Sequence, residues 1–350
     1  MNVIKKEILS FTRNGGWVVS IIFALVMVIT VGLAISGSIH HIPVGVSGTN
    51  SVVTTPIVDR FEDDDQITVS QHSYSDLLGL IQKGSLRAGV HINPLSQSKL
   101  SVTILIDSTD STIKNQLSNL LTSIVYELYG VYGEGLTVEV VELYGGKDFL
   151  SYVAPGVLAL SVLGAGLFGT SETILQEKDK KTLENVIVTG FNPLRFLTEK
   201  ILSMVVCISV ISAICLVLVF AVTGVPSVEG ILSIIVVLLV GEFLFISLGV
   251  GLSAFIPNEQ VSGVIISLVE LPMMFMSGVF FSIYQMNELV IPIANLNPLT
   301  HFIEMIRGLT LKQASLVDIV DPLLILGIIG ILTFGISTCM MYITVKKVVT

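Results

Sequence analysis

The chain is poor in charged residues: only 13% of its 350 residues are Asp, Glu, Lys or Arg, whereas 52% are hydrophobic. Its mean hydropathy is +0.87. A soluble globular domain has about 25% charged residues, so this composition excludes an ordinary soluble protein and indicates one that crosses a membrane several times. The few charges are mostly acidic, with a formal net charge of −9, which argues against nucleic-acid binding.

Cysteine and nucleotide-binding motifs are also scarce. The three cysteines (Cys207, Cys215 and Cys339) lie inside apolar runs, so none can cross-link the polar segment 36–147, and no zinc-type spacing exists. Gly145-Gly146-Lys147-Asp148 lacks both the spacing and the hydroxyl of a phosphate-binding P-loop. The histidines and serines form no nucleophile–base pattern. We therefore expect no catalytic residue, metal or cofactor in this chain, and no enzymatic activity from it alone.

Long apolar runs predict six membrane-spanning helices. These runs cover residues 18–35, 149–170, 201–222, 231–256, 261–283 and 323–345. Each is close to the roughly 20 apolar residues that a helix needs to cross a bilayer. Lys and Arg gather before the first run, between the second and third, and after the sixth, which places these segments and both termini in the cytoplasm. The expected fold is an α-helical, multi-pass protein of the cell (plasma) membrane.

The first two runs are separated by a long polar insert, residues 36–147. Its β-rich stretches are 42–46, 67–69, 86–92 and 100–106, and its helix-like stretches are 52–61, 73–82 and 111–129. This alternation predicts a small α/β domain that buries its own core. The neighbouring spans place the domain outside the cell. It divides the chain into an N-terminal interfacial helix with the first span (1–35), this insert, and a transmembrane region (148–350).

A charged segment, residues 171–190, separates the second and third spans. Leu183, Val186 and Ile187 share one face of a helix, while Lys181 and Glu184 point elsewhere. Such a helix either lies on the bilayer surface or docks into a groove on a soluble partner. An ordinary amphipathic juxtamembrane loop is the simpler alternative.

Two motifs resemble ABC-2 type transporter permeases. The first runs from Gln176-Glu177-Lys178 to Gly190 and is similar to the family signature E-R-E-x-G-T-L-E-x-L-L-V-T-P, with Lys181 in place of the usual glycine and Gly190 in place of the usual proline. The resemblance implies that this segment is the coupling helix that contacts an ATP-hydrolysing subunit. The coupling residues it implies are Lys181, Thr182, Leu183, Glu184, Val186 and Ile187.

The second motif lies between the fifth and sixth spans. It matches L-P-x-x-F-x-S-G-x-F-F, then L-N-P-L-T, then E-x-x-R. In the family this region forms an external gate, so the resemblance implies gate residues at Gly278, Asn297, Pro298, Glu304 and Arg307. Because Pro292 and Pro298 break residues 284–312, we expect short re-entrant or interfacial helices on the outer side. A plain extracellular loop is the alternative.

Two acidic residues, Glu242 and Glu270, lie deep inside predicted spans. A charge at the bilayer centre costs roughly 2.5–3.5 kcal/mol on insertion scales, so such residues usually face a bundle interior or a wet cavity. We weigh a pathway-facing or proton-linked role against a structural hydrogen bond from a neutral carboxylic acid.

The sequence as a whole predicts the permease subunit of an ATP-binding cassette exporter for an unidentified drug-, lipid- or peptide-like substrate. ATP and Mg²⁺ would be bound by a separate ATPase subunit, and a second permease protomer (in a homodimer or heterodimer) would complete the pathway. The competing interpretation is a receptor or scaffold that uses the spans only to anchor residues 36–147.

Overall fold

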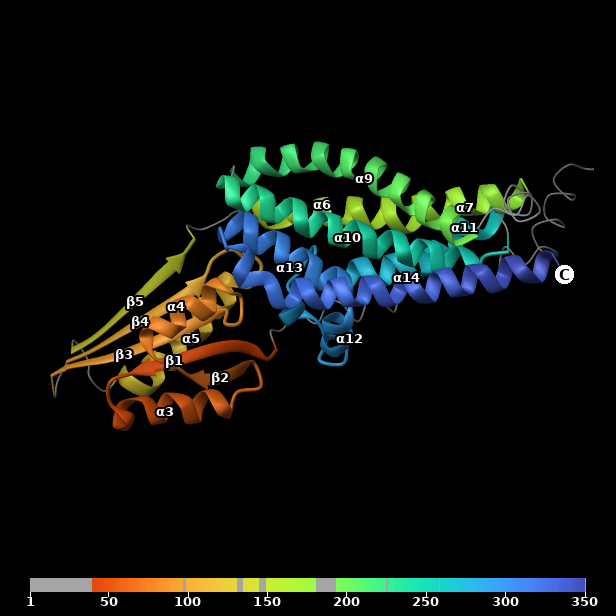
Figure 1. The fold of residues 1–350 in the computed structure, drawn as a ribbon. Coiled ribbons are helices and arrows are strands. Elements are labelled where there is room, and N and C mark those ends of the chain that lie inside the picture. Colours follow the sequence, from red (N-terminus) through yellow and green to blue (C-terminus); the bar gives the residue numbers. More distant parts are fainter. Residues whose placement is uncertain are drawn as a thin grey trace, which may run out of the picture.

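The computed structural model describes residues 40–349 except 97–98, 131–134, 145–148, 181–192, 225 and 258. An α/β domain sits at one end of an elongated bundle of helices, and the C-terminus lies at the other end (Figure 1). The predicted interfacial helix and first span, residues 1–35, lie outside the described residues, as do residues 181–190 of the coupling segment.

The α/β domain is built on a five-stranded sheet in the order β2-β1-β3-β4-β5. Strands β3 and β4 are antiparallel, and the other neighbours are parallel. Side chains of α3 and α5 form the core on one face, and those of α4 pack on the other. The strands are β1 (Ile42–Gly48), β2 (Ile67–Gln71), β3 (Ala88–Ser96), β4 (Lys99–Asp107) and β5 (Leu136–Leu143), and the helices are α3 (Ser51–Glu62), α4 (Tyr74–Gln82) and α5 (Lys114–Tyr129).

Local sequence explains most of this domain. Along β4 alternate residues from Leu100 to Ile106 are buried against α3 and α5, the period of two that a strand imposes. Ser73 caps α4 by accepting a hydrogen bond from the Asp76 backbone N–H at 3.3 Å. The four predicted strands and three predicted helices are all present, with ends that differ by a few residues. The fifth strand, β5, was not predicted.

The bundle is organised around α10 (Val228–Phe255), which contacts helices on several sides. α6 (Phe149–Gly164) passes through one π-helical turn, η2 (Ala165–Gly169), into α7 (Thr170–Asp179). α9 (Pro193–Thr223) and α14 (Val320–Val349) complete the long helices. Within the described residues, four stretches are long and apolar enough to cross a membrane: Phe149–Asp179, Thr198–Thr223, Val228–Phe255 and Leu316–Met341.

The fifth predicted span differs from the prediction. A single helix was expected over residues 261–283, but α11 (Glu259–Phe275) ends earlier, and a turn follows it. Its 17 residues reach about 25 Å, less than the roughly 30 Å of a bilayer core. The apolar sequence continues past Phe275, but Gly278 adopts a positive φ of 79°, which a right-handed helix does not contain. The expected continuous span is therefore wrong at its C-terminal end.

After this turn the chain forms short helices, as the prolines predicted. They are η3 (Ile283–Gln285), α12 (Ile291–Leu296), α13 (Pro298–Leu311) and η4 (Leu316–Ile319). α13 packs into the bundle, where its Phe302 ring lies so close to Gly241 of α10 that a Cβ there would meet it at 2.3 Å. This close approach explains the glycine in α10. α13 lies at the end of the bundle that adjoins the α/β domain (Figure 1).

Candidate functional site

The start of α13 is fixed by Asn297 and Pro298. The Asn297 Oδ1 accepts a hydrogen bond from the Leu299 backbone N–H at 3.1 Å, and Pro298 follows as the first helical residue. The Asn297 Nδ2 also donates to the Met273 carbonyl at 2.7 Å, in the last turn of α11, where carbonyls lack helical partners. Asn297 thus joins the beginning of α13 to the end of α11.

Arg307 of α13 holds the turn that follows α11. Its Nη2 donates to the Val279 carbonyl at 3.0 Å, and its Nε donates to the Tyr152 carbonyl of α6 at 3.1 Å. The guanidinium lies 3.7 Å above the Tyr152 ring, a cation–π contact. The Tyr152 hydroxyl in turn donates to the Gly278 carbonyl at 3.1 Å. Three elements (α6, α13 and the Gly278 turn) are therefore locked together.

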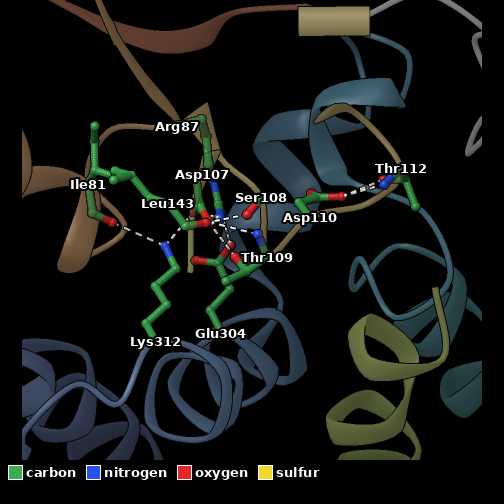
Figure 2. Close-up of polar contacts among 10 residues, drawn as sticks. All are labelled: Ile81, Arg87, Asp107, Ser108, Thr109, Asp110, Thr112, Leu143, Glu304 and Lys312. Atoms are coloured by element: carbon green, nitrogen blue, oxygen red, sulfur yellow. Dashed lines mark hydrogen bonds and ion pairs between the residues drawn. The ribbon is translucent and has the colours of Figure 1, made fainter. Parts of the chain in front are cut away.

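A cluster of charged side chains joins α13 to the α/β domain (Figure 2). Asp107, the last residue of β4, is fully buried at its side chain and accepts from Lys312 Nζ at 2.5 Å. Lys312, which caps the C-terminal end of α13, also donates to the Ile81 carbonyl of α4 at 3.2 Å. Its side chain is only 5% exposed. A buried lysine requires such partners because an unpaired charge away from water is costly.

Arg87 connects the same carboxylate to a second point on α13. It precedes β3, and its Nη1 lies 3.4 Å from Asp107 Oδ2 while its Nη2 lies 2.6 Å from Glu304 Oε1. Burial acts to raise the pKa of Asp107, but the charges of Lys312 and Arg87 outweigh it and hold that pKa below its ordinary value. The carboxylate is therefore ionised, and its pairing joins β3, β4 and α13.

A cavity of about 340 Å³ lies between the α/β domain and the helices. Its wall includes Arg87 and Lys83 from the domain, Glu304 and Arg307 from α13, and the Gly278 turn. Pockets that hold small molecules commonly have a volume of about 300–1,000 Å³ and often occur between domains. We take this cavity and the contacts around α13 as the candidate functional site.

The structure does not bring the two acidic residues of the spans to this cavity wall. Glu242 of α10 is 1% exposed, and its carboxylate accepts from the Ser209 hydroxyl of α9 at 2.6 Å. It therefore faces the bundle interior rather than lipid. Glu270 of α11 is partly buried, with Oε1 beside Gly164 at the end of α6.

The sequence indicated only part of this site. It singled out Gly278, Asn297, Pro298, Glu304 and Arg307, and the structure places all five around α13 and the turn before it. It missed Arg87, Asp107 and Lys312. A signal existed in two of them, since Asp107 and Lys312 are charged residues that directly follow buried apolar segments. The predicted coupling residues from Lys181 to Ile187 lie outside the described residues.

Comparison with known proteins gives matches to membrane transport proteins. A family model described as "ABC-2 family transporter protein" matches residues 15–338. Nodulation protein J of Bradyrhizobium diazoefficiens is 28% identical over 204 residues, which cover 57% of this chain and 75% of that protein. The inner membrane transport permease YhhJ of Escherichia coli is 26% identical over 186 residues, 52% of this chain and 50% of that protein. No solved structure gives a significant match.

Proposed function

This chain belongs to the ABC-2 family of transporter proteins, and on that premise we propose that it is the membrane subunit of an ATP-driven exporter. The observation that carries the proposal is the family match over residues 15–338, together with four long apolar helices. One of its relatives is itself called a transport permease. The energy would come from a separate ATP-binding subunit, which would hold ATP and Mg²⁺, and two permease protomers would form the pathway between them.

The proposed orientation places the α/β domain outside the cell and the coupling segment in the cytoplasm. The arrangement of the bundle supports it, because α7, which leads into residues 181–190, lies at the end opposite the α/β domain (Figure 1). A partner that hydrolyses ATP in the cytoplasm would contact that end. Leu183, Val186 and Ile187 would provide the apolar contact, and Lys181, Thr182 and Glu184 would orient it.

The proposed external gate is α13 with the Gly278 turn. α13 is the one helix among the described residues that pairs by charge with the α/β domain and also holds α6 and the turn after α11. A shift of α13 would therefore move the outer end of the bundle and change the ion pairs that join this helix to the domain. Pro298 and Asn297 would set the position of the helix, and Glu304 and Arg307 would join it to its two neighbours.

The test of this function is recovery of ATPase activity with the tagged chain, purified from its native membranes in mild detergent. The wild-type chain should bring an ATP-hydrolysing subunit with it. Leu183→Asp should insert normally but lose most of the associated ATPase and of the transport. Leu95→Asp is a matched control, because Leu95 is 62% exposed on β3 of the α/β domain.

Two results would contradict the proposal. Full ATPase association and transport in Leu183→Asp would show that the coupling segment is assigned wrongly. Absence of any ATPase from the wild-type preparation, with an intact chain, would favour the receptor or scaffold interpretation instead.

A further inference from the structure

The cavity between the α/β domain and the helices is lined by a guanidinium group that has no acidic partner among the described residues. Arg307 lines it, and its hydrogen bonds within the described residues go to two neutral carbonyls, those of Tyr152 and Val279. A guanidinium has five N–H donors, so three remain for other acceptors. Among the described residues no carboxylate lies within ion-pair distance of Arg307, so the contacts of its positive charge are with neutral groups: two carbonyls and the Tyr152 ring.

The geometry fixes this guanidinium rather than leaving it mobile. The Tyr152 ring supports one face of its plane at 3.7 Å, and the two carbonyls hold its Nε and Nη2. Arginine recognises carboxylate and phosphate groups through a planar fork of N–H groups, and a fork that is already oriented loses less conformational entropy on binding. Arg307 therefore has the properties of an anion-recognising residue.

Two of the other cations of the wall are paired with carboxylates, whereas Lys83 has no ion pair among the described residues. Lys312 is paired with Asp107, and Arg87 is paired with Asp107 and Glu304. Asp318 accepts hydrogen bonds from Ser315. Asp110 and Asp321 are also part of the wall and disfavour an anion near them. The Arg87 Nε is buried and has no acceptor among the described residues, so a second guanidinium in the wall also has an unused donor.

We propose that this cavity binds an acidic group, a phosphate or carboxylate, of the transported molecule, with Arg307 as the residue that recognises it. The inference rests on the proposed function in naming the transported molecule as the source of the group. The binding itself does not depend on transport. Glu304 opposes an anion in the empty cavity and competes with it for Arg87, so Glu304 sets how tightly the anion is held.

The experiment measures binding by calorimetry with the purified full-length chain in an uncharged detergent. Two probes separate the sources of the acidic group: inorganic phosphate tests a free anion, and dihexanoyl phosphatidic acid tests a lipid headgroup. Dihexanoylglycerol, which lacks the phosphate, is the uncharged control. The variants are Arg307→Gln, Arg307→Lys, Glu304→Gln and, as a distant surface control, Lys99→Gln at the exposed start of β4.

The wild-type chain should bind at least one acidic probe and not the glycerol control. Arg307→Gln should weaken binding of the acidic probe by about tenfold or more, because it removes a charge-assisted hydrogen bond. Arg307→Lys keeps the positive charge and should bind the probe more tightly than Arg307→Gln but more weakly than wild type. Glu304→Gln should tighten binding by roughly threefold, because it removes a like charge and frees Arg87. This variant keeps the proposal testable even where Arg307 variants fail to fold, since Glu304 is 43% exposed.

The response to each probe identifies the source. Binding of both indicates that the anion alone suffices, and binding of the lipid alone indicates a headgroup that needs its acyl chains. Absence of binding to either probe, or equal binding by wild type, Arg307→Gln and Glu304→Gln, would overturn the proposal. An anion that binds normally to a chain with no transport activity would leave this site intact and count against the exporter function instead.

Discussion

The two sides of α13 are held by different physical interactions. Toward the α/β domain the contacts are ion pairs, Lys312 with Asp107 and Arg87 with Glu304. Toward the helices the contacts run from the Arg307 guanidinium to neutral carbonyls and the Tyr152 ring. Both sides use cationic side chains, but only the first side places an ionisable carboxylate opposite them.

This difference predicts which contact can change. An ion pair is lost when its carboxylate is protonated, whereas carbonyls and an aromatic ring do not titrate and arginine stays charged at all accessible pH values. The contact with the α/β domain is therefore sensitive to charge and pH, and the contact with the helices is not. In our account, α13 moves with the helices and can separate from the domain.

The largest effect should come from breaking the buried pair. Lys312→Leu leaves the Asp107 carboxylate without its nearest cation, and removal of one partner from a buried pair typically costs roughly 3–5 kcal/mol. We expect a large fall in the thermal unfolding midpoint of the purified chain and faster hydrogen exchange in β4 and α13. Lys99→Leu, at the exposed start of β4, is the control. Equal stability of the two variants would show that the Lys312 contact is not important for the fold.

The second effect tests the neutral side of α13. Arg307→Lys keeps the charge but cannot donate to the Tyr152 and Val279 carbonyls in the same fork geometry, so it should cost roughly 1.5–3 kcal/mol. The loss, measured by thermal unfolding, should be the same at pH 4 and pH 7. A loss that varies strongly with pH would mean that a titrating group pairs with Arg307.

The third effect is a pH dependence at Asp107. Because its pKa in the folded chain lies below the ordinary value of about 3.9, ionised Asp107 contributes stability above pH 4 that is lost as the pH falls through the folded pKa. The protection of the α13 amides against hydrogen exchange, relative to the intrinsic exchange rate at each pH, should fall below pH 4. In Asp107→Asn, which has no carboxylate at this position, the fall in protection below pH 4 should be smaller than in wild type. If the variant loses as much protection below pH 4 as wild type, the pH dependence belongs to another group.

A smaller effect is expected at Glu242 inside the bundle, which forms no ion pair among the described residues. Ser209→Ala removes the hydroxyl that donates to Glu242, and hydrogen bonds between membrane helices are worth about 0.6 kcal/mol on average. Glu242→Gln keeps the shape and removes the charge, so expression should stay near normal while transport or its pH dependence changes. Glu270→Gln is the matched comparison. Identical transport by wild type and Glu242→Gln at every pH would leave Glu242 with a structural role only.

The sequence predicted the elements that depend on local patterns. The β-rich stretches gave four strands of the α/β domain, and the helix-like stretches gave α3, α4 and α5. Strand β5 was missed because Glu139 and Glu142, residues of low strand propensity, interrupt its apolar sequence, and because α5 separates it in the chain from its partner β4. The predicted C-terminal end of α11 was too late because the sequence stays apolar through the turn at Gly278, where the backbone has a positive φ.

The candidate site divides in the same way. Motif resemblance found Glu304 and Arg307, which lie close together on one helix. It did not find Arg87, Asp107 or Lys312, which form the ion pairs with the α/β domain. Lys312 and Asp107 are 205 residues apart in the sequence, and Arg87 and Glu304 are 217 apart. No spacing within a motif records a contact of this kind. Only the packing of the α/β domain against α13 brings these residues together (Figure 2).

The most direct test of the central claim, that charge joins α13 to the α/β domain, is a double-mutant cycle on Arg87 and Glu304. The readout is hydrogen exchange of residues 298–311 in wild type, Arg87→Gln, Glu304→Gln and the double variant. For a pair that is partly exposed we predict a coupling free energy of about 0.5 kcal/mol, with both single variants exchanging faster and the double variant little faster than either. Strictly additive effects would mean that Arg87 and Glu304 act independently, and would contradict the claim.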